Sequence, residues 1–267
     1  MATCSTHGRS CSRSLIPCSL VHAETAEVCR EAWSAWRPRM PARAWFVTLA
    51  PTRLLLAAGV VAGIGMPAAI VADGVTRPGY SLWHHGASQL GTGPRWWLLT
   101  TTFVLGGLLL IAFAAGLRRV LHPGADGRWV PILLAVCGLS FIAAGVIPTD
   151  PALGYPPGQV SVVTVAGRVH GLIGLVLFAC LSASAFVLAR RLRLRSRTWG
   201  RFSRACGLLV IVLAVVAGSV YRLEVAGVLR QAPAGLLEHG ALLVAFCWIT
   251  VVGLRLNRVV DSARHPS

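Results

Sequence analysis

Six long apolar segments, separated by short polar connections, dominate the chain from about residue 50 onward. They run over residues Leu54–Ala72, Trp96–Leu117, Trp129–Thr149, Gly171–Ala189, Ala205–Tyr221 and Gly235–Leu254. The first four contain no charged residue, and each is close to the ~20 residues that a helix needs to cross ~30 Å of hydrocarbon. The pattern predicts an all-α polytopic membrane protein, with six transmembrane helices in one bundle over residues 50–256.

The arginines are distributed unevenly between the connections. The N-terminal flank, the second and fourth connections and the C-terminal tail hold 17 of them, whereas the three odd connections hold five. Cytoplasmic loops of membrane proteins carry an excess of basic residues. We therefore expect a multi-pass protein of a bacterial plasma membrane with both termini cytoplasmic, and residues 257–267 forming a cytoplasmic C-terminal tail.

Composition supports the membrane class and narrows the partners. Hydrophobic residues make up 55% of the 267 positions and charged residues only 13%, against about 25% charged residues in soluble domains. The formal net charge is +16, but the basic residues flank the apolar segments. Anionic lipid headgroups and the cytoplasmic bias explain this charge, so we expect membrane lipids as partners and no nucleic acid. The sequence does not set the oligomeric state.

Residues 1–44 differ from the rest of the chain. They are polar, rich in Ser, Arg and Cys, and contain no apolar run, which is typical of a disordered tail. An equally weighted alternative is that Met40 is the true initiator and residues 1–39 are not translated. Four of the eight cysteines lie inside the apolar segments, where a thiol behaves as a small hydrophobic group, so the chain predicts no disulfide framework. The other four, in this tail, form no CxxC pair, which disfavours zinc binding there.

Two pairs of glycines within the apolar segments have a spacing of four residues. These are Gly59 with Gly63 and Gly167 with Gly171. Small residues at this spacing allow two helices to approach closely in a membrane. We expect helix contacts at both pairs.

Polar residues near the predicted spans gather on the predicted outer side. The candidate cluster comprises His84, His85, Ser88, Asp150, Arg168, His170, Glu238 and His239. Ionisable residues within spans are costly and usually face protein or water. We expect the five members from the third, fourth and sixth spans to converge at the outer mouth of the bundle.

Three interpretations of this cluster remain open. In the first, which we favour over any catalytic role, Arg168 pairs with Asp150. Arg222 pairs with Glu224 or Glu238 in the same interpretation. In the second, the cluster binds zinc, with candidate ligands His84, His170, His239 and Asp150. In the third, it lines a water-filled pocket that binds a lipid headgroup or moves protons. No catalytic residue is assigned.

The segment Gly79–Gly91 has glycine at both ends and an aromatic pair. It suits a short interfacial helix over residues 81–90 that caps the outer face. Such a helix would place His84 and Ser88 on one face, and likewise His85 and Gln89. The chain contains no HExxH, GxSxG, Walker or dinucleotide-binding motif, so recognisable soluble-enzyme chemistry is absent.

Three motifs carry a family resemblance. They are Ser88-Gln89-Leu90-Gly91, the turn from Gly145 to Pro151, and His170. Over about residues 50–256 the chain resembles the domain of unknown function 998 family of bacterial and archaeal multi-span membrane proteins. The resemblance implies topology and no catalytic assignment. The family often has an acidic residue where this chain has Gln89.

The leading functional hypothesis is a non-enzymatic membrane protein whose outward-facing polar pocket binds a lipid or small ligand. The alternative is a zinc-dependent membrane hydrolase of the lipid amidase kind. It is similar to alkaline ceramidases, which surround zinc with Ser, Asp and His within a helical bundle. Here the corresponding residue types are Ser88, Asp150, His84, His170 and His239.

Overall fold

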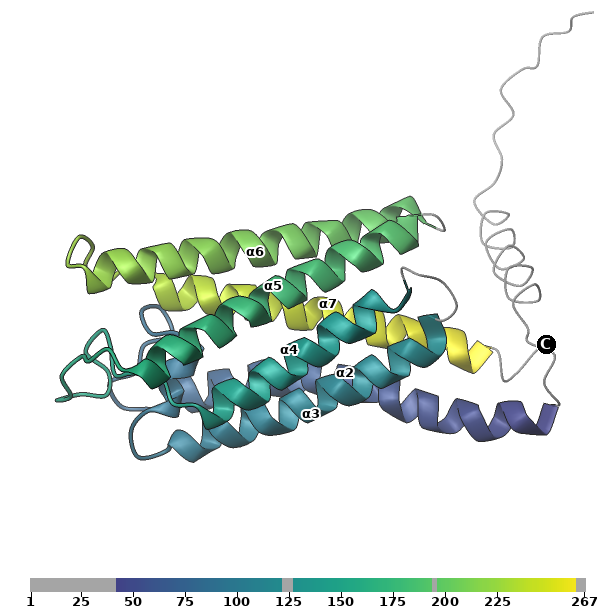
Figure 1. Cartoon of the computed structure of the whole chain (residues 1–267), viewed down its shortest axis with the longest axis horizontal. Helices are drawn as coiled ribbons and strands as arrows, with labels where there is room; N and C mark the ends of the chain where they lie inside the picture. Colours follow the sequence, from purple (N-terminus) through teal and green to yellow (C-terminus); the bar gives the residue numbers. More distant parts are fainter. Residues whose placement is uncertain (1–41, 122–126, 194–195, 263–267) are drawn as a thin grey trace, which may run out of the picture. The chain divides into compact units, whose positions relative to one another are not determined.

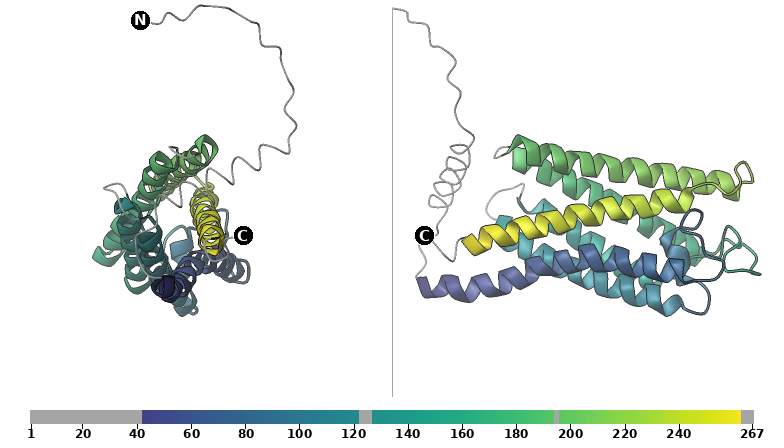
Figure 2. Two further views of the ribbon diagram at one scale, coloured as in Figure 1. Left: turned by 90° about the vertical axis from the view of Figure 1, so that its right-hand side faces the viewer. Right: turned by 180° about the vertical axis from the view of Figure 1, so that it is seen from behind.

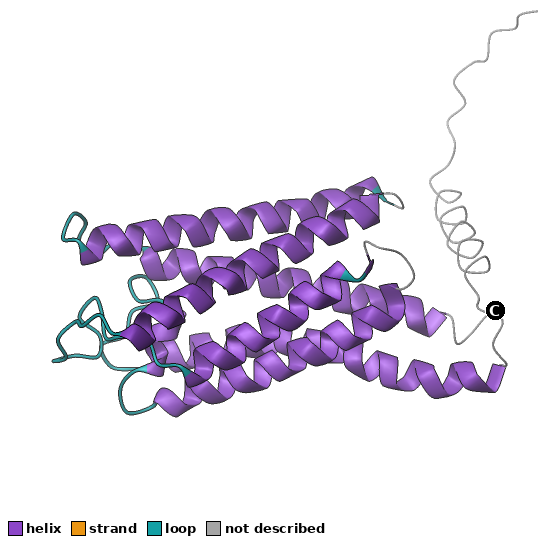
Figure 3. Cartoon of the chain, viewed as in Figure 1, coloured by secondary structure: helices purple, strands orange, loops and turns teal. Residues whose placement is uncertain are grey.

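The computed structural model describes residues 42–121, 127–193 and 196–262, and these residues are almost entirely helical (Figures 1 and 3). The six long helices are α2 Ala42–Val75, α3 Trp96–Leu121, α4 Trp129–Val146, α5 Val165–Arg193, α6 Arg197–Val225 and α7 Ala234–Ser262. Over the described ranges there is no β-strand, and one short 3₁₀ helix, η1, covers Ala87–Gly91. Each long helix contains a stretch long and apolar enough to cross a membrane, which confirms the all-α class with six candidate spans.

Helices that follow one another in the sequence pack side by side. Contacts join α3 to α4, α4 to α5, α5 to α6 and α6 to α7, and two opposite views show the same order (Figures 1 and 2). Helix α2 reaches both α3 and α7, because Gly59 lies against Phe113 and Gly63 lies against Phe246. The first glycine pair therefore makes the expected close contacts. In the second pair, Gly167 lies against the side chain of Asp150, whereas Gly171 borders open space, so this pair makes no helix contact at Gly171.

Aromatic and aliphatic side chains fill the interior between the helices. The ring of Phe141 contacts the rings of Phe103 and Phe246 at centroid distances of 5.3 and 5.6 Å, and all three side chains are buried. Large apolar side chains also cover the outward surface of the helices, for example Leu105 and Leu172. A soluble protein rarely exposes so continuous an apolar surface, so this surface suits contact with lipid.

The helices extend further than the apolar segments. The fourth was expected to begin at Gly171 but begins at Val165, and the sixth continues to Ser262. Helical hydrogen bonding continues through polar residues, whereas hydropathy marks only the apolar part. His170 therefore lies inside α5 and not ahead of it. The predicted tail over residues 1–44, the Met40 start and the last five residues fall wholly or mainly outside the described ranges.

Candidate functional site

Three connections lie at the same end of the helices. They are residues 76–95, 147–164 and 226–233, which we call the loop layer (Figures 1 and 3). Most of the cluster expected from the sequence lies in this layer or in the adjacent helix turns. The contacts within the loop layer show which of those side chains bind other groups of the protein and which are open to a ligand.

A buried arginine anchors the first connection of the loop layer. The guanidinium of Arg77 donates to both carboxylate oxygens of Asp73, at 3.2 and 2.7 Å. It also donates to the carbonyls of Thr92 and Arg95 and to the hydroxyl of Tyr155. The side chains of Arg77 and Asp73 are only 4% and 8% exposed. Sequence reasoning counted Arg77 only as a loop charge; its i,i+4 spacing from Asp73 was the available signal.

Three aromatic side chains from two connections of the loop layer pack together. The ring of Tyr80 lies 5.4 Å from that of His85 and 5.3 Å from that of Tyr155. Its hydroxyl donates to the carbonyls of His85 and Gly86, and burial raises the pKa of this phenol. Tyr80 is therefore a neutral structural residue at ordinary pH.

The hydrogen bonds of His85 fix its tautomer. Its Nδ1 accepts from the backbone N–H of Ser81 at 2.9 Å, and its Nε2 lies 3.1 Å from the carbonyl oxygen of Leu153, to which it must donate. The ring is buried, and desolvation lowers its pKa, with neighbouring His84 acting in the same direction. A neutral His85 therefore ties two connections of the loop layer together and has no free ring nitrogen for a metal.

We expect acidification to destabilise the protein partly through His85. The pKa of His85 is lower in the folded state than in the unfolded chain. Below about pH 6.5 the unfolded chain therefore binds the proton more readily, and the free energy of unfolding decreases as the pH is lowered. Thermal unfolding in detergent between pH 7.5 and 5 should show a smaller pH dependence in His85→Gln than in the unmodified chain. The control Arg168→Gln should show the same pH dependence as the unmodified chain. An equal pH dependence in His85→Gln and the unmodified chain would contradict this assignment.

The polar residues at the start of α7 hold the first connection in place. Glu238 accepts from the backbone N–H of Ala87 at 3.0 Å, at the start of η1. His239 has its Nδ1 2.6 Å from the carbonyl oxygen of Gly235 and its Nε2 3.4 Å from the Tyr80 hydroxyl. His84 lies 3.5 Å from a carboxylate oxygen of Glu224. These three members of the expected cluster therefore act mainly within the protein.

Asp150 organises the start of α5 and does not pair with arginine. Its carboxylate accepts from the backbone N–H and the hydroxyl of Thr164, at 2.7 and 2.6 Å. The Thr164 hydroxyl in turn accepts from the N–H of Gly167, which caps the helix. Arg168 is exposed, and among the described residues it forms no ion pair. The Asp150–Arg168 pair is therefore wrong, because Thr164 already satisfies the carboxylate.

The pairing proposed for Arg222 is also wrong within the described part of the chain. Arg222 is exposed and no ion pair joins it to a glutamate. Glu224 lies beside His84, and Glu238 binds the backbone at Ala87. Both carboxylates bind loop residues that are distant in sequence, and the local spacing of charges does not predict such contacts.

The expected short helix is smaller than predicted. Instead of residues 81–90, only η1 is helical, and His84 and His85 lie in the turn before it. Gly86 has extended backbone angles, φ −68° and ψ 157°, which end the turn ahead of the 3₁₀ helix. His84 and Ser88 therefore do not share a helix face. His85 and Gln89 nevertheless reach adjacent backbone carbonyls, those of Leu153 and Ala152.

Gln89 is buried and makes only part of its hydrogen bonds. Its Nε2 donates to the carbonyl of Ala152 at 3.0 Å, while its Oε1 has no partner among the described residues. An ionised acidic side chain here would place a carboxylate oxygen against that carbonyl. The amide of Gln89 therefore suits this backbone contact where a carboxylate would not.

A pocket of about 280 Å³ lies between η1, α3, α4 and the first turns of α5. We call it the His170 pocket. Its lining comprises Ser88, Gly91, Trp96, Leu99, Thr100, Ala144, Gly145, Val146, Pro148, Thr149 and His170. Seven of these residues come from the three motifs that carry the family resemblance, so segments from three parts of the sequence meet at one cavity.

His170 is held in a defined orientation at this pocket. It is 7% exposed, and its Nδ1 lies 2.7 Å from the carbonyl oxygen of Ile147. A carbonyl only accepts, so Nδ1 carries a proton, and in the tautomer that this contact selects the lone pair lies on Nε2. Neither this Nε2 nor the hydroxyl of Ser88 forms a hydrogen bond to the described residues. These two groups are available to a ligand.

The arrangement gives no support to a zinc site. Within residues 42–121, 127–193 and 196–262, no group of three or more His, Cys, Asp or Glu side chains is placed to hold a metal ion. The candidate ligands divide between separate contacts: His84 beside Glu224, His239 beside Tyr80, and His170 with Asp150 at the junction of α4 and α5. The zinc-dependent hydrolase is not supported.

The fold and this polar end define a multi-pass helical membrane protein. A family model described as protein of unknown function (DUF998) matches residues 60–255. The chain belongs to this family, which confirms the resemblance seen in its motifs. No curated protein and no solved structure matches the chain.

Proposed function

We propose that this protein binds a lipid or small ligand in the His170 pocket through an uncharged hydroxyl or amide group. The observation that carries the proposal is the buried imidazole of His170, whose Nδ1 is fixed on a backbone carbonyl while Nε2 is left without a partner among the described residues. Nε2 is not one of the fully buried side-chain atoms that lack a partner in the described structure, so it is accessible as a hydrogen-bond acceptor at the pocket. A donor on a ligand would satisfy it.

The chemistry of the lining favours an uncharged group. The pocket is lined by no Asp, Glu, Lys or Arg of the described residues, so an ionic headgroup would lose hydration without gaining a counter-charge. Ser88 and Thr149 supply hydroxyls, while Leu99, Val146 and Pro148 supply apolar wall. A small polar group attached to an aliphatic chain, as in diacylglycerol, fits this combination.

The proposal places the loop layer on the outer side of a bacterial plasma membrane, with the six helices forming one bundle and both termini cytoplasmic. The distribution of arginines supports this orientation. Exposed Trp83, Trp96 and Trp97 at the loop layer support its position at a membrane interface. Modification of a cysteine introduced at Ala125 by an impermeant reagent in intact cells would overturn the orientation.

The test uses diacylglycerol with a photoreactive acyl chain and full-length protein in phosphatidylcholine nanodiscs. We expect labelled peptides from residues 88–100 and 144–149, and competition by unlabelled diacylglycerol. In His170→Asn the amide can still donate to the Ile147 carbonyl, but the acceptor at Nε2 is gone. Labelling should therefore fall about fivefold, the effect of one lost hydrogen bond.

Two further measurements make this test decisive. His170→Gln, whose amide oxygen can replace Nε2, should retain more labelling than His170→Asn, and Arg168→Gln should match the unmodified protein. Labelling of His170→Asn at the unmodified level would refute the proposal. Stoichiometric zinc in detergent-purified protein, lost in His170→Ala, would also refute it and revive the hydrolase alternative.

A further inference from the structure

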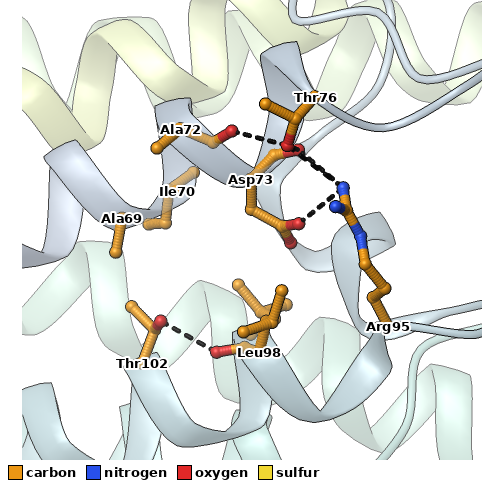
Figure 4. Close-up of a pocket in the computed structure, with 9 residues that line it drawn as sticks. Ala69, Ile70, Ala72, Asp73, Thr76, Arg95, Leu98 and Thr102 are labelled. Carbon is orange, nitrogen blue, oxygen red and sulfur yellow. Dashed lines mark hydrogen bonds and ion pairs between the residues drawn. The ribbon is translucent and has the colours of Figure 1, made fainter.

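A second cavity, of about 270 Å³, lies between α2 and α3 near the loop layer. We call it the Arg95 pocket. Asp73, Thr76 and Arg95 form its polar end, and Ala69, Ile70 and Leu98 belong to its apolar wall (Figure 4). A pocket with a charged end and an aliphatic wall is suited to bind an amphiphile, which has a polar group and an apolar chain.

The polar end carries an excess positive charge. Asp73 is shared by two guanidinium groups, Arg77 at 2.7 Å and Arg95 at 3.1 Å, so the three side chains together have a net charge of about +1 at neutral pH. Arg77 is buried, whereas the side chain of Arg95 is 39% exposed. The excess charge therefore lies on the group that a ligand can reach.

Much of the hydrogen-bonding capacity of Arg95 is unused. Within the described residues, all hydrogen bonds and the ion pair of its side chain involve one nitrogen, Nη2, which contacts Asp73 and the hydroxyl of Thr76 (Figure 4). Nη1 and Nε make no hydrogen bond to the described residues. Nε and Nη1 lie on different edges of the planar guanidinium, and Nη1, which has two N–H groups, can donate to a phosphate oxygen.

Neighbouring residues indicate the depth of this group in a membrane. Trp96 and Trp97 follow Arg95 directly and are 54% and 53% exposed. Exposed indoles favour the level of the lipid headgroups. Arg95 is thus at the height of lipid phosphates, while the wall of the pocket continues along α2 and α3 toward the hydrocarbon.

We propose that the Arg95 pocket binds an anionic phospholipid, with a phosphate oxygen on Nη1 of Arg95 and one acyl chain along Ala69, Ile70 and Leu98. A phosphate with one negative charge neutralises the excess charge of the cluster. This site is separate from the His170 pocket and selects for charge, whereas the described lining of the His170 pocket is uncharged. The observations at Arg95 do not involve His170, so this site does not rest on the function proposed above.

The test measures binding of phosphatidylglycerol and phosphatidylcholine to the full-length protein in detergent by native mass spectrometry. We expect a preference for phosphatidylglycerol. It should weaken about fivefold in Arg95→Gln, as expected for one basic residue at a membrane surface. Ala69→Phe, which fills the apolar part without touching a charge, should weaken it as well. Arg168→Gln removes an exposed arginine at the same end and should leave the preference unchanged.

Several outcomes would overturn the proposal. Equal binding of the two lipids to the unmodified protein would exclude selection by charge. An unchanged preference in both Arg95→Gln and Ala69→Phe would place the lipid elsewhere, and Ala69→Phe also guards against misfolding of the arginine variant. Competition by inorganic phosphate as strong as that by phosphatidylglycerol would identify a soluble anion as the ligand.

Discussion

Replacing Arg77 with methionine is expected to lower the free energy of unfolding by about 3 kcal/mol or more. The substitution keeps much of the side-chain volume but removes the donors that serve the carbonyls of Thr92 and Arg95 and the hydroxyl of Tyr155. It also leaves Asp73 with Arg95 as its one charged partner among the described residues. Equilibrium unfolding in mixed micelles with sodium dodecyl sulfate would measure the loss.

The matched control for this experiment is Arg168→Met, which removes an exposed arginine from the same end of the protein. Surface substitutions of this kind usually change stability by no more than about 0.5 kcal/mol. Adding Asp73→Asn to Arg77→Met should recover part of the lost stability, because the neutral amide of asparagine needs no counter-charge. Equal stability of Arg77→Met and Arg168→Met would show that the buried arginine does not stabilise the loop layer.

The second large effect is expected at the contact between α3 and α4. A Cβ atom on Gly138 would lie 2.6 Å from the carbonyl oxygen of Gly107 and 2.8 Å from Ile111. Because the obstacle is backbone, Gly138→Leu must separate the two helices. Overpacking of a core costs about 1–3 kcal/mol and sometimes more, and we expect the upper part of this range in the same unfolding assay.

Gly171→Leu provides the same change of residue in a different environment. Gly171 lies in α5, and a Cβ atom added there would meet no described atom within 4 Å, so a leucine has room. Its expected cost is near zero, because leucine favours a helix over glycine. If Gly171→Leu destabilised the protein as strongly as Gly138→Leu, close packing at Gly138 would not explain the effect.

The architecture could be predicted from the sequence because a chain segment in hydrocarbon must satisfy its backbone hydrogen bonds internally, which favours a helix. The surrounding hydrocarbon also requires apolar side chains, so each span appears in the sequence as a long apolar segment. The ends of the helices were less accessible. Val165 and Arg193 lie outside the apolar segment of the fourth span, since helical hydrogen bonds continue where hydropathy falls.

The polar site was predicted only in part. Residue type and position indicated that His170 and Ser88 belong to one end of the protein, and they line one pocket. The roles of Arg77 and Tyr155 were missed because their partners include backbone carbonyls and side chains from distant loops. Hydropathy and charge counting carry no information on such contacts, which depend on how the loop layer folds.

Leu99 lines both the His170 pocket and the Arg95 pocket, and its side chain is 3% exposed. A displacement of this side chain that enlarges one cavity takes volume from the other. Two ligands whose polar groups never meet would therefore compete for the space around a single leucine. Thermodynamic linkage requires this negative cooperativity to be equal in both directions, so each ligand would weaken the binding of the other by the same factor.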